Sequence, residues 1–123
     1  MVGVDSDRAI RLYKKTGLRP IVPQDERCEM LSYQSCVDYV IVVDDVTEEG
    51  AWEFKLLDVT NPDVFIAVHD SYPKEQLREI EKRCGTVTVL PRQAENTSTS
   101  KLIERALKGH LEEMLAELTV RRK

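Results

Sequence analysis

Hydroxyl side chains gather at one point of the chain, just before its last long helical pattern. The run reads Thr97-Ser98-Thr99-Ser100-Lys101. Hydroxyl residues at a helix start bring free backbone N–H groups, side-chain donors and the positive end of the helix dipole to one place. This combination suits a phosphate or triphosphate, and the same residues also suit a simple N-cap. On this stretch alone, anion binding and capping are about equally favoured.

Carboxylates and a hydroxyl also follow the first apolar segment of the chain. Asp5, Ser6 and Asp7 come directly after Val4. Each of these side chains can cap the helix that follows, and each can instead reach a ligand. Both interpretations stay open for every residue taken alone.

Two arginines stand in the stretch between the first two helical patterns and at the start of the second. Arg19 precedes Pro20, and Arg27 follows Glu26. A guanidinium group can make two-point contacts with phosphate oxygens, and a neighbouring proline restricts where the arginine points. Arginines in loops are usually solvated, so these two indicate a phosphate site only in combination with other signals.

His69 and Asp70 follow the third apolar segment. A histidine can act as a general acid or base near neutral pH. Without a partner at a diagnostic spacing, however, a turn or capping role is more common. We assign no role to His110, which falls within the last helical pattern.

Strands and helices alternate along the chain and place these candidates. Four short apolar segments are typical of buried parallel strands, at residues 2–4, 39–43, 64–68 and 86–90. Helical patterns cover residues 7–15, 25–34, 47–59 and 73–83, and a longer one follows residue 98. This order predicts an α/β fold with a doubly wound parallel sheet. Ligands of such sheets bind outside the carboxyl ends of the strands, which is where the candidate residues lie.

The last helix carries an apolar stripe at spacings of three and four. It consists of Ile103, Leu107, Leu111, Met114, Leu115 and Leu118. Such a stripe must be covered by the sheet or by another subunit. Packing in the core is the commoner outcome, and a dimer contact at the outer end of the helix is the alternative. We expect a homodimer.

Composition restricts the class of protein. At 123 residues the chain fits one domain, and its net charge of −4 gives no general attraction to nucleic acid. No apolar stretch reaches the roughly 20 residues that cross a bilayer, and no secretory signal is visible, so we expect a cytoplasmic protein without a membrane partner. The cysteines are odd in number and lack CxxC spacing, which favours neither disulfides nor a metal site.

Five segments, in order, resemble motifs of the cytidylyltransferase-like nucleotidyltransferases. This family contains glycerol-3-phosphate cytidylyltransferase, the heptose-phosphate adenylyltransferase domain and FAD synthetases of the archaeal type. Residues 2–7 are similar to its V-x-V-x-S-D strand end, and residues 37–40 to its V-D-x-V element. The other matches are R-P-I with E-R at residues 19–21 and 26–27, K-P-D-V-F at 61–65, and S-T-S-x-I-I at 97–103.

The resemblance implies a Rossmann-like fold and nucleotidyl transfer. A phosphate of a small acceptor attacks the α-phosphorus of CTP or ATP and releases pyrophosphate, commonly with Mg²⁺. By the same resemblance, the residues that contact the triphosphate are Thr97, Ser98, Thr99, Ser100 and Lys101, with Arg92 upstream. The residues near the acceptor or nucleotide are Asp5, Asp7, Arg19, Arg27, His69 and Asp70.

Two departures from the family pattern qualify this expectation. The H-x-G-H motif, which in the family precedes the equivalent of Val2, is absent, so we assign no catalytic residue. We expect a domain truncated at its amino end, without the first βα unit and hence without the central strand of the family order 3-2-1-4-5, and with impaired activity. His69 also stands where relatives commonly carry glycine.

Two other classes of function compete with an enzyme. One is a non-catalytic module that binds nucleotide or associates subunits through its last helix. The other is a flavodoxin-like regulatory domain. The latter is disfavoured because its acidic cluster and downstream lysine are not arranged at comparable strand ends, and because it leaves the hydroxyl run unexplained.

Overall fold

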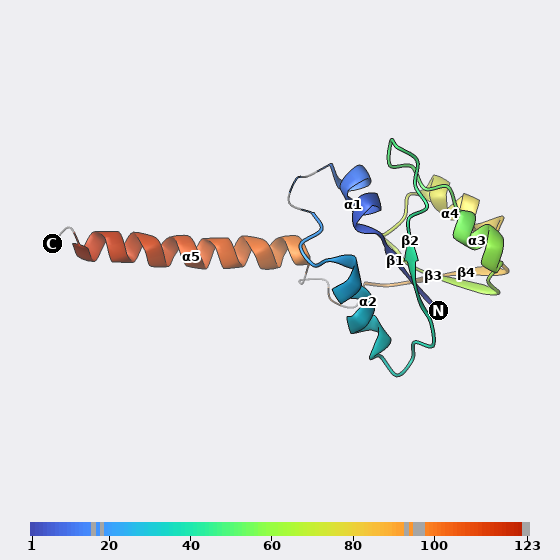
Figure 1. Ribbon diagram of the computed structural model, residues 1–123, viewed down its shortest axis with the longest axis horizontal. Helices are drawn as coiled ribbons and strands as arrows, with labels where there is room; N and C mark the ends of the chain where they lie inside the picture. The colour runs from blue at the N-terminus through green and yellow to red at the C-terminus, as the bar shows by residue number, and fades with distance from the viewer. Residues whose placement is uncertain (16, 18, 93, 95–97, 122–123) are drawn as a thin grey trace. The chain divides into compact units, whose positions relative to one another are not determined.

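The chain is an alternating α/β protein. The computed structural model describes residues 1–15, 17, 19–92, 94 and 98–121. Its elements, in chain order, are β1 (Val2–Asp5), α1 (Asp7–Lys14), α2 (Gln24–Ser32), β2 (Val40–Val43), α3 (Lys55–Thr60), β3 (Val64–Val68), α4 (Lys74–Glu81), β4 (Thr86–Leu90) and α5 (Thr99–Arg121) (Figure 1). The four predicted strands are all present.

The strands form two parallel pairs. β1 pairs with β2 in a register that runs from Val2 opposite Val40 to Asp5 opposite Val43. β3 pairs with β4. Thr86 N donates to Asp63 O at 2.8 Å and His69 N to Leu90 O at 3.0 Å, so both strands advance in the same direction. The predicted parallel α/β arrangement is therefore confirmed.

The chain divides into two compact units. The first unit comprises residues 1–65 and 74–88, and the second comprises residues 66–73 and 89–123. The first unit contains a small apolar core whose buried side chains are Val4, Ala9, Val46, Leu57 and Ile80. Our expectation of a single domain over residues 1–123 stays a prediction.

α1 begins where the sequence supplies a cap. Ser6 has an extended backbone, and its hydroxyl accepts a hydrogen bond from Ala9 N at 2.9 Å. Asp7 adds a negative charge in the first turn, which favours the positive end of the helix. Ser6 and Ala9 are both buried, so the cap anchors α1 in the first unit.

The predicted helix over residues 47–59 is wrong in its first part, because α3 covers only Lys55–Thr60. Gly50 has a φ of +84°, and a Cβ at this position would lie 2.9 Å from the backbone carbon of Leu12. The chain therefore turns at Gly50 instead of continuing as a helix. The later start is set by Asp45, whose carboxylate accepts a hydrogen bond from Leu56 N at 3.1 Å.

The last helix, α5, is a continuous helix of 23 residues (Figure 1). Ile103 is partly covered, whereas every residue from 104 to 119 is exposed. The apolar stripe beyond Ile103 is thus not covered by the described part of the chain, contrary to the commoner outcome for such a stripe. In the same part of the chain, no helix combines the length and apolar character needed to cross a membrane.

Candidate functional site

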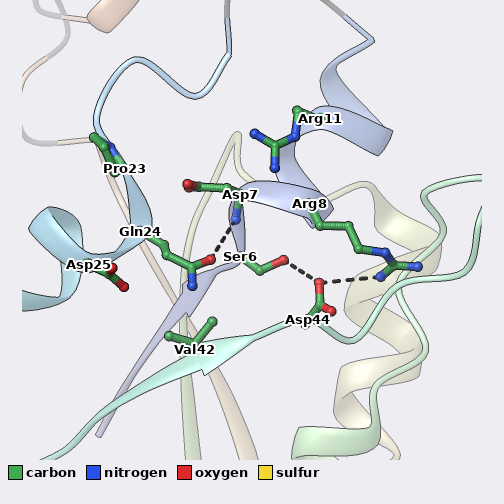
Figure 2. Close-up of a pocket in the computed structure, with 9 residues that line it drawn as sticks. All are labelled: Ser6, Asp7, Arg8, Arg11, Pro23, Gln24, Asp25, Val42 and Asp44. Atoms are coloured by element: carbon green, nitrogen blue, oxygen red, sulfur yellow. Dashed lines mark hydrogen bonds and ion pairs between the residues drawn. The ribbon is translucent and has the colours of Figure 1, made fainter.

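A polar cluster in the first unit lies at the carboxyl ends of β1 and β2. The hydroxyl of Ser6 donates to the carboxylate of Asp44, and Arg8 approaches the same carboxylate at 3.4 Å (Figure 2). Arg8 also pairs with Glu48 at 2.7 Å. The hydrogen bond from Ser6, assisted by Arg8, lowers the pKa of Asp44. This carboxylate is therefore held in its charged form.

Arg27 ties three segments of the first unit together. Its guanidinium group donates to Asp5 O at 2.8 Å, to Val22 O at 3.0 Å and to the carboxylate of Asp7 at 2.6 Å. The side chain of Arg27 is only 22% exposed. The predicted residues Asp5, Asp7 and Arg27 thus come together. Arg27, however, donates its hydrogen bonds to groups of the protein itself.

The neighbours of Arg27 are also engaged within the chain. The second carboxylate oxygen of Asp5 accepts a hydrogen bond from Tyr13 Oη at 2.8 Å. Asp7 N donates to the side chain of Gln24 at 3.0 Å. These contacts hold the turn after β1 in place, so its polar groups have fixed positions.

A cavity of about 420 Å³ opens beside this turn, and its polar lining includes Ser6, Asp7, Arg8, Arg11, Gln24 and Asp44 (Figure 2). Arg8 is committed to carboxylates. Arg11 is exposed and has no ion-pair partner among the described residues. Arg11 is therefore the cationic group of this cavity that is most available to an anionic ligand.

A second cavity, of about 390 Å³, runs along β1 and α2. Gly3, Val4, Met30 and Leu31 give it an apolar lining, with Arg27 among its polar residues. A lining of this kind suits the flat, weakly polar part of a ligand better than a charged group.

Two predicted residues of the second unit form an ion pair. Arg92 Nε lies 2.9 Å from the carboxylate of Asp70, and their side chains are 39% and 40% exposed. The pair joins the segments that follow β3 and β4, and His69 lies next to it with an exposed side chain. Because Arg92 remains partly exposed, it can still meet an anion from solvent.

The start of α5 combines a cap with exposed hydroxyls. Ser98 Oγ accepts a hydrogen bond from Lys101 N at 3.2 Å, which confirms the capping interpretation for this residue. Thr99, Ser100 and Lys101 are exposed. Thr97 lies outside the described residues. The cap engages the N–H group of Lys101, and the exposed side chains of Thr99 and Lys101 beside it can be reached by an anion from solvent.

Arg19 is partly buried in the loop between α1 and α2, where it makes an interaction within the chain. Sequence reasoning missed Arg8, Arg11, Gln24 and Asp44. One signal was available for Asp44, because two consecutive aspartates directly follow the apolar segment 39–43. Arg8 and Gln24 gave no local signal, since their contacts join residues far apart in the chain. Nothing in the local sequence distinguishes Arg11 from an ordinary surface arginine.

Among the described residues, no group of three histidine, cysteine, aspartate or glutamate side chains could hold a metal ion. Mg²⁺ in nucleotide sites is commonly held by one or two carboxylates together with the phosphates of the substrate. A Mg²⁺ ion that arrives with a nucleotide and is held mainly by its phosphates would need no such group.

Comparison with known proteins gives one family. The sequence profile of the cytidylyltransferase-like family matches residues 1–105. The bifunctional protein HldE of Syntrophotalea carbinolica is 31% identical over 109 residues, which are 87% of this chain and 21% of that protein. HldE of Helicobacter pylori strain HPAG1 is 36% identical over 110 residues, 89% of this chain and 22% of that protein.

A third relative, HldE of Geobacter sulfurreducens, is 31% identical over 115 residues, 92% of this chain and 22% of that protein. The chain thus spans about a fifth of the length of the curated relatives it matches. No solved structure matches it significantly.

Proposed function

This chain belongs to the cytidylyltransferase-like family, and from that premise we propose that it serves nucleotidyl transfer from CTP or ATP to a small phosphorylated acceptor. An oxygen of the acceptor phosphate attacks the α-phosphorus, the bond from the α-phosphorus to the bridging oxygen breaks, and pyrophosphate leaves. The observation that carries the proposal is the match over residues 1–105, which includes every candidate residue of both units.

The phosphates of the nucleotide bind, in this proposal, at the start of α5. The first-turn N–H groups and the positive helix end attract an anion, and the exposed Thr99, Ser100 and Lys101 add donors and a charge. Ser98 contributes as the cap, and Thr97 by its place in the motif. Arg92 approaches the phosphates from its ion pair with Asp70. A Mg²⁺ ion bound to the nucleotide would neutralise part of the charge of its phosphates.

The acceptor is assigned to the first unit. The carboxylates of Asp5 and Asp7 border its site, and Arg27 acts as a positioning residue because it is hydrogen-bonded to both segments. Arg11, as the unpaired cation among the described lining residues, contacts the acceptor phosphate. Arg19 stiffens the loop that follows α1, and we leave the role of His69 unassigned.

Binding and turnover are separate parts of this proposal. The only histidines of the sequence are His69 and His110, and no H-x-G-H motif is present. We therefore assign no catalytic histidine within these 123 residues, and we test nucleotide binding separately from turnover.

Calorimetric titration with CTP and with ATP, each with Mg²⁺, tests the phosphate site. Ser98→Ala and Thr99→Ala should weaken binding by about tenfold each, because each removes one donor or its supporting cap. Thr119→Ala is the matched control, since Thr119 is a hydroxyl residue near the other end of the same helix, bonded to Leu115 O at 2.8 Å. Unchanged affinity in the two test variants removes the phosphate assignment.

A second candidate function is subunit association without catalysis. The exposed apolar stripe of α5 favours it, because soluble monomers rarely leave such a surface uncovered. A chain that binds neither nucleotide but self-associates would support this function over nucleotidyl transfer.

A further inference from the structure

The apolar stripe of α5 continues beyond residue 105, where the match to the family profile ends. Leu107, Leu111, Met114 and Leu118 are 58%, 57%, 48% and 57% exposed. The family profile ends at residue 105, whereas the match to HldE of Geobacter sulfurreducens covers 92% of the chain and so extends past Leu111. The exposure of the stripe calls for a covering surface, which the described part of the chain does not provide.

The spacing of the stripe is that of a helix made to pair with another helix. From Leu107 the successive steps of +4, +3 and +4 lead to Leu111, Met114 and Leu118, which are heptad positions d, a, d and a. Ala116 lies on the opposite face at position f. The stripe is thus a single seam about two heptads long.

We propose that α5 pairs with α5 of a second copy of this chain in antiparallel orientation. In antiparallel helix pairs each a position packs beside a d position. One register satisfies every layer: Leu107 packs against Leu118 of the partner subunit, and Leu111 against Met114 of the partner subunit. Both layers recur by two-fold symmetry, so one stripe covers the other completely.

Charge decides the orientation. Glu104 occupies the a position before Leu107. A parallel pair sets Glu104 directly against Glu104 of the partner subunit, which is a like-charge contact in the seam. The antiparallel register places these two carboxylates about 25 Å apart, at the helical rise of about 1.5 Å per residue.

The flanks of the antiparallel seam are also complementary. His110 lies beside Glu117 of the partner subunit, where an imidazole N–H can donate to the carboxylate. Lys108 lies beside Leu115 of the partner subunit, so its aliphatic stem can cover the apolar edge. Each of these contacts occurs twice in the dimer.

Sedimentation equilibrium over a concentration series tests the association. The wild-type chain should show a monomer–dimer equilibrium, and Leu111→Glu should weaken the dimer by at least about 100-fold, because the dimer contains two copies of the charge. Ala116→Glu adds the same charge to the opposite face and should leave the equilibrium unchanged. A monomeric wild type, or equal weakening by both variants, overturns the proposal.

The orientation is tested with engineered cysteines in a chain whose Cys28, Cys36 and Cys84 are replaced by serine and whose cooperative melting has been verified. Under mild oxidation, a tagged Leu107→Cys chain should form a disulfide with an untagged Leu118→Cys chain. Leu107→Cys chains alone should not cross-link. Efficient cross-linking of Leu107→Cys with itself overturns the antiparallel orientation.

The dimer does not depend on the proposed function, because both tests are run without nucleotide. Loss of nucleotide binding in Ser98→Ala with an intact dimer separates the two proposals, as does a monomeric chain that still binds CTP or ATP.

Discussion

The turn after β1 and the start of α5 both place a serine cap and charged residues at the start of a helix, but they use them differently. Ser6 is 5% exposed and both accepts from Ala9 N and donates to Asp44. Ser98 is partly exposed, and the two hydroxyl residues after it face solvent. Similar residue types thus build structure in one region and remain accessible to a ligand in the other.

The arginines of the two regions differ in the same sense. Arg27 has three acceptors within the protein and is 22% exposed. Arg92 pairs with the single carboxylate of Asp70 and is 39% exposed. A less exposed arginine with three partners supports stability, whereas a more exposed arginine with one partner can exchange it for a ligand at little cost.

The largest expected effect is that of removing Arg27. Arg27→Ala should lower the free energy of unfolding by about 3 kcal/mol, because three acceptors lose a charged donor and the contact with the Asp7 carboxylate is partly buried. Arg92→Ala, the matched variant of the second unit, should lower it by less than about 1 kcal/mol. Urea denaturation measures both. Equal losses of unfolding free energy in the two variants would show that Arg27 contributes no more to stability than Arg92 does.

The serine caps give the intermediate effect. Ser6→Ala should cost about 2 kcal/mol, since it removes a buried cap and leaves Asp44 without its closest donor, whereas Ser98→Ala should cost about 0.5 kcal/mol. Thermal melts give the stabilities, and titration with CTP gives the affinities. For CTP affinity we expect the opposite ranking: the Ser98→Ala variant should bind CTP more weakly than the Ser6→Ala variant. If Ser6→Ala had the larger effect on both stability and CTP affinity, the two serines would not differ in role.

The smallest effect is a pH dependence of the first region. The pKa of Asp44 is lowered in the folded chain, first by the Ser6 hydroxyl and then by Arg8. Its stabilisation is present above the unfolded pKa of about 3.9 and is lost as the pH falls through the lower folded value. Melting temperatures between about pH 5 and pH 2.5 should therefore fall less in Asp44→Asn than in the wild type.

Other carboxylates, such as Glu79, also have a lowered pKa. They contribute equally to both proteins, so the difference isolates Asp44. Identical pH profiles would mean that the hydrogen bond from Ser6 adds nothing to stability.

Local signals in the sequence predicted most of the elements. Short segments rich in β-branched and apolar residues gave all four strands, and Ser6 followed by Asp7 gave the start of α1. These features depend on residues close together in the chain, where propensity and capping act directly.

Contacts between distant residues explain what the sequence could not predict. The helix expected over residues 47–59 fails because Gly50 meets the backbone of Leu12. In the candidate site, Asp44 meets Ser6 across 38 positions, and Arg8 meets Glu48 across 40. No local pattern encodes such pairings. The type of residue was therefore predictable, but its partner, and hence its role, was not.

The continuity of α5 links the two proposals made for it. One uninterrupted helix carries the candidate phosphate residues in its first turn and the exposed leucines in its later turns. Helix formation is cooperative, so whatever orders one end lowers the entropic cost of ordering the other. Protein concentration would then act as an effector of nucleotide affinity. Dilution would dissociate the dimer and thereby weaken nucleotide binding.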